Sequence, residues 1–146
     1  MRERILVINP NSTQAVTDHM NVALDVFRFP AGPEIVCETL KSGPPGIETQ
    51  AHVDAATANL LAWFDQVSER KHAAAAVVGC FSDPGLIALR QTLTMPVFGM
   101  GESSYLTAAA TGESFGVIAV VSASIARHKR TVPSPAPEAI RWPSGE

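Results

Sequence analysis

The sequence is poor in cysteine. It has two among 146 residues, Cys37 and Cys80, which are far apart and have no CxxC spacing. This scarcity argues against a disulfide framework and against a zinc site, which need more ligands at closer spacing. The histidines show no metal-ligand spacing either, so we expect surface or capping roles for them and no bound metal. They are His19, His52, His72 and His128.

The chain also lacks an excess of positive charge and a long apolar run. Its net charge is −3, which gives no electrostatic reason to expect nucleic acid or an anionic membrane as a partner. No apolar run approaches the length of a membrane span. The run at 5–8 is too short for the core of a signal peptide, and Asn9 and Pro10 end it. We therefore expect a cytoplasmic protein.

No common hydrolase pattern is present. The sequence has no GxSxG nucleophile elbow and no Ser–His–Asp order. The Gly99-Met100-Gly101 sequence is a weak dinucleotide signal, and it follows the wrong strand with Glu102 where a pyrophosphate would lie. Glu102 is better interpreted as a first-turn acid that complements a helix dipole.

Apolar runs alternate with amphipathic stretches along the chain, and hydrophobic residues make up 46% of it. This composition is typical of a globular domain. The runs predict strands at about 4–9, 34–39, 74–80, 96–99 and 115–121. Helices between the strands imply an α/β fold, with three αβα layers around a parallel sheet of about four to five strands.

Apolar residues recur at helical spacing between the predicted strands. The first set is Val16, Met20, Leu24 and Phe27; the second is Val53, Ala56, Leu60, Phe64 and Val67; the third is Leu86, Leu89 and Leu93. A fourth helix is expected from about 102 to 111, and a fifth begins near 122. Four of the eleven prolines lie in the last fourteen residues. We therefore predict a domain at 1–126 and a Pro-rich, disordered tail at 127–146.

Cys80 lies where the third strand ends, within the sequence Gly-Cys-Phe-Ser-Asp-Pro-Gly at 79–85. Ser82 or Asp83 is suited to cap a following helix, with Pro84 in its first turn. A thiol beside such a helix start would have a lowered pKa and a reactive thiolate. The alternative is a small buried cysteine that packs as an apolar residue.

Other polar residues follow the remaining strands at the same edge of the sheet, where ligands of such folds bind. Asn11, Ser12 and Thr13 come after the first strand. Either Ser12 or Thr13 only caps a helix that starts there, or the free amides of that helix start, with Asn11 and Ser12 beside them, bind an anionic or carbonyl group. The loop at 41–48 is flexible and either turns the chain or forms a lid. Cys37 lies mid-strand and is interpreted as structural.

Five segments together resemble the aspartate/glutamate/hydantoin racemase superfamily, most of all its hydantoin and allantoin racemase branch. They are RILVINPNST at 4–13, GPPGIET at 43–49, GCFSDPGL at 79–86, PVFGMGESS at 96–104 and FGVIAVV at 115–121. The resemblance covers about residues 4–130. It implies a flavodoxin-like half of a two-domain racemase.

The resemblance also implies an activity, namely cofactor-independent racemisation of a small 5-substituted hydantoin, allantoin or amino acid. In this family two cysteines face opposite sides of the stereogenic carbon and exchange acid and base roles. Cys80 matches the first cysteine, and Asn11 and Ser12 match the loop that holds the substrate. Glu48, Ser82 and Asp83 match positions near the pocket.

The second cysteine of the family lies in a second α/β half, and this sequence ends shortly after the crossover into that half. Cys37 lies in the wrong strand to replace it. The expectation is therefore a truncated, impaired racemase that self-associates into a homo-oligomer. The alternatives are an inactive module or relic that binds small anions at Asn11 and Ser12, and a one-cysteine lyase or decarboxylase.

Overall fold

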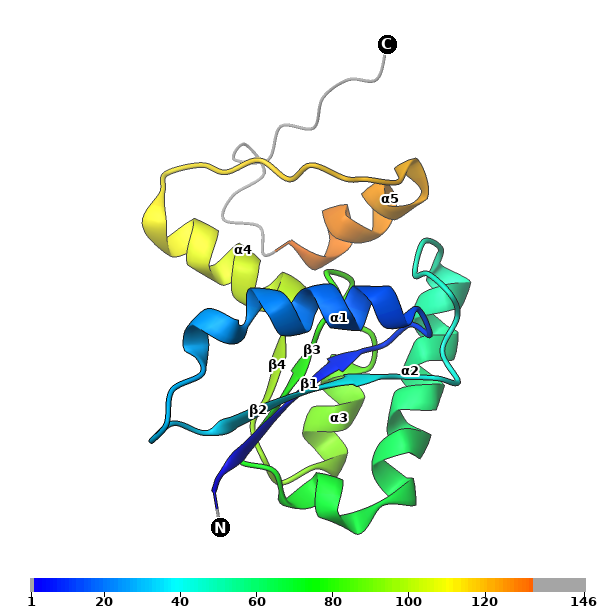
Figure 1. Ribbon diagram of the computed structural model, residues 1–146. Coiled ribbons are helices and arrows are strands. Elements are labelled where there is room, and N and C mark those ends of the chain that lie inside the picture. The colour runs from blue at the N-terminus through cyan, green and yellow to red at the C-terminus, as the bar shows by residue number, and fades with distance from the viewer. Residues whose placement is uncertain (1, 133–146) are drawn as a thin grey trace.

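Four short parallel strands form the centre of the structure, a computed structural model that describes residues 2–132 (Figure 1). The strands are β1 (Arg4–Asn9), β2 (Glu34–Thr39), β3 (Ala75–Val78) and β4 (Val97–Gly99). The α-helices are α1 (Gln14–Ala23), α2 (Gln50–Gln66), α3 (Leu86–Thr92), α4 (Met100–Thr111) and α5 (Ser122–Thr131). Two 3₁₀ turns, η1 (Asp25–Phe27) and η2 (Ser68–His72), complete the elements.

The strand order is β2-β1-β3-β4, and every neighbouring pair is parallel. Helix α1 lies on one side of the sheet, and α2 and α3 lie on the other (Figure 1). The predicted α/β class with a parallel sheet is thus confirmed. The chain crosses from β2 over β1 to β3, so the order reverses between β1 and β3. Ligands of open α/β sheets bind outside the carboxyl ends of the strands at such a point.

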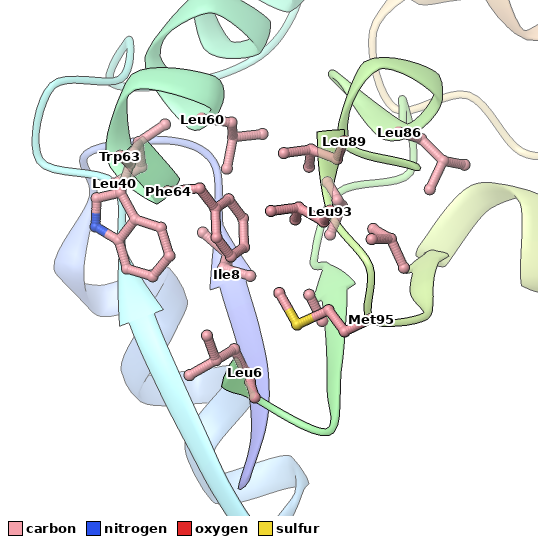
Figure 2. Close-up of a cluster of buried hydrophobic side chains, with 14 residues drawn as sticks. Leu6, Ile8, Leu40, Leu60, Trp63, Phe64, Leu86, Leu89, Leu93 and Met95 are labelled. Carbon is pink, nitrogen blue, oxygen red and sulfur yellow. The ribbon is translucent and has the colours of Figure 1, made fainter. Parts of the chain in front are cut away.

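The core lies between the sheet and the helices α2 and α3. Leu6 and Ile8 alternate along β1 and point toward Phe64 of α2 (Figure 2). Leu60 of the same helix and Leu89 of α3 are fully buried. The apolar spacing predicted for these two helices is confirmed except at Val67, which follows α2 and is 36% exposed. The other predicted residues are all buried, namely Val53, Ala56, Leu60, Phe64, Leu86, Leu89 and Leu93.

The apolar face predicted for the first helix is wrong in part, since only Met20 and Leu24 of its four residues are half-buried. Val16 is 37% exposed and Phe27 is 60% exposed, whereas Thr17 is buried. Thr17 Oγ1 accepts a hydrogen bond from Asn9 Nδ2 at 3.1 Å and lies 2.5 Å from Thr39 Oγ1. A buried polar contact therefore sets which face of α1 meets the sheet, and the helix already ends at Ala23.

The segment at 115–121 was expected to form a strand, and this is wrong as well. Among residues 2–132 it has no strand partner, and Ile118 and Val120 are almost fully exposed. An apolar run becomes a strand only where a neighbouring strand accepts and donates its hydrogen bonds. Helix α5 then continues to Thr131, past the boundary expected at 126. The rest of the predicted tail, 133–146, lies outside the described residues.

None of the helices within residues 2–132 is long and apolar enough to cross a membrane.

Candidate functional site

A cavity of about 480 Å³ lies beyond the carboxyl end of β3. Five parts of the chain line it: the turn after β3, helix α4, the segment at 115–121, helix α5 and, through Ile47, the loop at 41–48. Helix α5 and the segment before it lie beyond the strand ends in Figure 1. The polar and titratable lining residues are Cys80, Ser82, Ser104, Tyr105, Ser124, Arg127 and His128.

The turn that carries Cys80 is built from backbone hydrogen bonds. Gly79 N–H donates to Ile8 O at 2.8 Å, which joins the end of β3 to β1. Asp83 N–H donates to Cys80 O at 2.9 Å and closes the turn. Asp83 has a φ of 46° and Gly85 a φ of 73°. Both values lie in the left-handed region, which Gly and Asp tolerate better than most residues.

These two dihedral angles explain why the predicted helix start after Cys80 is wrong. Helix α3 begins at Leu86 with Gly85 as its N-cap, and neither Ser82 nor Asp83 caps it. The left-handed conformation of Asp83 and Gly85 interrupts any helix that would start earlier. Helix α3 therefore starts six residues after Cys80 in the sequence.

Asp83 instead caps a different helix. Its Oδ1 accepts a hydrogen bond from Gly101 N–H at 2.9 Å, and its Oδ2 accepts one from Glu102 N–H at 2.6 Å. Both amides belong to the first turn of α4, so the carboxylate satisfies donors that have no partner within the helix. A Cβ at position 101 would lie 2.4 Å from the Phe81 carbonyl oxygen, which explains the glycine there.

Glu102 lies in the first turn of α4, as predicted, and forms an ion pair with α3. Its Oε1 and Oε2 accept hydrogen bonds from Arg90 Nη1 at 3.0 Å and Nη2 at 2.5 Å. These hydrogen bonds lower the pKa of Glu102. Two carboxylates thus hold helix α4 in place. Asp83 connects it to the turn after β3, and Glu102 connects it to Arg90 of α3.

Burial raises the pKa of the half-buried Cys80 thiol, contrary to the lowered pKa expected from its sequence position. Hydrogen bonding by Ser82 and the charge of Arg127 oppose this shift, while the charge of Asp83 adds to it. Burial is the largest of these contributions and outweighs those that lower the pKa. A desolvated thiol holds its proton more strongly.

The loop after β1 is organised by Asn9, for which the sequence predicted only the end of the first strand. Asn9 is fully buried. Its Nδ2 donates to Asn11 Oδ1 at 3.0 Å and to Thr13 O at 3.2 Å. Asn11 Oδ1 also accepts from Thr13 N–H at 2.9 Å. The only sequence signal for this arrangement is an asparagine that directly follows an apolar strand.

Of the six predicted site residues, Cys80 and Ser82 line the cavity. Asn11 and Ser12 lie in the neighbouring loop, where Ser12 N–H donates to Pro44 O at 2.9 Å. The carboxylate of Asp83 is engaged by α4. Glu48 is exposed, and its backbone oxygen faces Arg127 at 3.4–3.5 Å.

Helix α5 contributes Ser124, Arg127 and His128 to the cavity, and none of these was predicted as a site residue. His128 was expected at the surface, but it is buried, and its Nδ1 lies 3.1 Å from the Tyr105 hydroxyl. Burial and the charge of Arg127 lower the pKa of His128. These side chains reach the cavity through long-range packing of α5, which no local sequence pattern predicts. Among residues 2–132 no three His, Cys, Asp or Glu side chains are grouped so that they could hold a metal ion.

The sequence matches the Asp/Glu/hydantoin racemase family model over residues 5–136. It is 30% identical over 118 residues to a hydantoin racemase of Paenarthrobacter aurescens, which covers 81% of this chain and 50% of that protein. It is 32% identical over 119 residues to one of a Pseudomonas species (strain NS671), with 81% and 47% covered. The chain thus spans about half the length of these curated relatives.

A solved structure shares the fold. The structure of an allantoin racemase from Klebsiella pneumoniae is similar with a TM-score of 0.79 and 27% identity. The similarity covers 88% of this chain and 51% of that one.

We predict that alkylation of Cys80 requires alkaline pH. In Cys37→Ser protein the rate of reaction with iodoacetamide should rise with a midpoint above the ordinary thiol pKa of about 8.5, because only the thiolate reacts. Mass spectrometry of samples quenched across a pH series measures the rate, and urea-unfolded protein provides the ordinary midpoint. A midpoint in the folded protein below that of the unfolded chain would contradict the effect of burial.

Proposed function

The chain belongs to the Asp/Glu/hydantoin racemase family, and we propose that it catalyses cofactor-independent proton transfer at the stereogenic carbon of a small 5-substituted hydantoin, allantoin or amino acid, with Cys80 as the proton-transfer group. The observation that carries this proposal is the position of the Cys80 thiol, in a cavity at the carboxyl end of β3. The names of the relatives, hydantoin racemase and allantoin racemase, support the substrate class.

The proposed chemistry begins with the Cys80 thiolate. It removes the proton from the carbon next to the substrate carbonyl, and the electron pair of the C–H bond moves into an enolate. Return of a proton to the opposite face of that carbon inverts it. Return to the same face only exchanges the proton with solvent. The pKa of Cys80 is raised by burial, so the thiolate fraction, and with it the rate, should increase with pH.

Inversion needs an acid on the second face, and the second thiol of this chain is not placed for that role. Cys37 lies in the middle of β2, opposite Val7 of β1. Its sulfur lies 4.0 Å from Arg28 Nη2, and Cys37 does not line the cavity that contains Cys80. We therefore propose that this polypeptide by itself exchanges the substrate proton faster than it inverts the carbon.

We predict that the protein exchanges the C5 proton of one enantiomer of a 5-substituted hydantoin, or of allantoin, in D₂O. Proton NMR follows the loss of the C5 signal, and optical rotation in the same tube follows inversion. The signal should decay faster than in a no-protein control, and the rotation should decay more slowly than the signal. Cys80→Ser should abolish the acceleration, whereas Cys37→Ser should retain it.

Two outcomes contradict this proposal. Absence of exchange above background from folded protein would overturn the catalytic role and would favour a binding module or a relic. Exchange that persists unchanged in Cys80→Ser protein would assign the base to another residue. Circular dichroism of each variant shows that the comparison is made on folded protein.

We also propose that the chain self-associates through the segment at 115–121. Ile118 is 95% exposed and Val120 is 97% exposed, so this segment presents apolar surface to solvent. Sedimentation velocity should show a dimer or larger species whose fraction increases with concentration. Combined Ile118→Ser and Val120→Ser substitution should weaken association, whereas Val26→Ser, at another exposed valine, should not. A monomer at all concentrations would contradict the proposal.

A further inference from the structure

Arg127 is a buried cation without a matching anion. Its side chain belongs to α5, and the residue is only 5% exposed. Nη1 and Nη2 lie 3.4 and 3.5 Å from the Glu48 backbone oxygen, at the limit of a hydrogen bond. The buried Nε has no hydrogen-bond partner. None of the ion pairs found within residues 2–132 includes Arg127.

Such an arrangement is costly unless something pairs with the charge. Buried charges are normally matched by an opposite charge with hydrogen bonds, because desolvation of an isolated ion is unfavourable. Two long contacts to one carbonyl oxygen do not satisfy a guanidinium, which has five N–H donors. The guanidinium therefore keeps hydrogen-bonding capacity that the described residues do not use.

Arg127 lines the same cavity as Cys80 and Ser82. Much of the remaining wall is apolar, with Phe81 from the turn after β3 and Phe115 from the segment before α5. Charge interactions in a partly desolvated cavity are stronger than in water. A small molecule in this cavity would have the thiol at one part of the wall and the guanidinium at another.

We propose that Arg127 binds the carboxylate of a small anionic ligand in this cavity. The planar guanidinium suits two parallel N–H···O hydrogen bonds to a carboxylate. The inference rests on the proposed function of the same site and narrows its substrate class. It favours a hydantoin with a carboxylate-bearing side chain, or an amino acid, over uncharged allantoin.

The competing explanation is that Arg127 only holds α5 against the loop at Glu48. That role depends on a backbone carbonyl oxygen and predicts no preference between charged and neutral ligands. A pair of probes that differ only in charge therefore separates the two explanations.

The test uses hydantoin-5-acetate and its neutral analogue hydantoin-5-acetamide. Isothermal titration calorimetry on the full chain with Cys80→Ser measures binding without turnover. We expect the carboxylate to bind about 10- to 100-fold more tightly than the amide, the range for a hydrogen-bonded charge pair. Adding Arg127→Gln should remove this difference and leave affinity for the amide unchanged. Arg130→Gln, at an exposed arginine of the same helix, should leave both affinities unchanged.

Equal affinity of the two probes for the Cys80→Ser chain would overturn the inference, and this result does not require the Arg127 variant to fold. Tighter carboxylate binding that survives Arg127→Gln would overturn it as well. Arg127→Lys, which keeps the charge but loses the planar fork, should retain part of the preference. Carboxylate binding in a protein that shows no proton exchange would support the anion site and overturn only the catalytic proposal.

Discussion

The carboxylate of Asp83 joins the turn after β3 to the first turn of α4, and the rest of the site depends on this link. Gly101 and Glu102 each donate a backbone N–H to one of its oxygens. Helix α4 then carries Tyr105, whose hydroxyl contacts His128 of α5. The part of the cavity wall formed by Tyr105 and His128 is therefore positioned by this link, together with the direct ring contacts of Phe81 with Tyr105 and His128. Burial raises the pKa of Asp83, and its hydrogen bonds with the two amides oppose that shift.

A second buried polar residue, Asn9, connects the end of β1 to the helix that follows it. Asn9, at the end of β1, donates to the loop that leads into α1 and to Thr17 within that helix. Asn9 ends β1 and Asp83 follows β3, the two strands between which the strand order reverses. The apolar core thus forms the sheet, and one polar side chain at or after the end of each of these strands sets the path of the backbone at the ligand-binding edge.

The sequence predicted the parts of the fold that depend on local periodicity. The strands at 4–9 and 34–39 match in their bounds, and the buried face of α2 was found because apolar spacing and burial coincide. The turn after β3 was misread because Ser-Asp-Pro is a common helix start. Its aspartate caps a helix eighteen residues later, which only the tertiary structure brings close.

Only the cavity residues that directly follow a strand were predicted from the sequence. Cys80 and Ser82 follow a strand and were found from their position. Arg127 and His128 lie on a helix that reaches the sheet edge by long-range packing, and nothing in their local sequence distinguishes them from surface residues. The expected strand at 115–121 failed because an apolar run does not reveal whether a partner strand is present.

The central claim is that the two hydrogen bonds of Asp83 hold α4 to the turn of Cys80. Amide hydrogen exchange measured by NMR on Asp83→Asn protein tests it directly, because asparagine tolerates the left-handed backbone but offers one oxygen in place of two. Protection of the Gly101 or Glu102 amide should fall, and the free energy of unfolding should decrease by about 1 kcal/mol, as for other lost caps. Asp54→Asn, at an exposed position of α2, should leave both unchanged. Unaltered protection of both amides in folded Asp83→Asn protein would contradict the account.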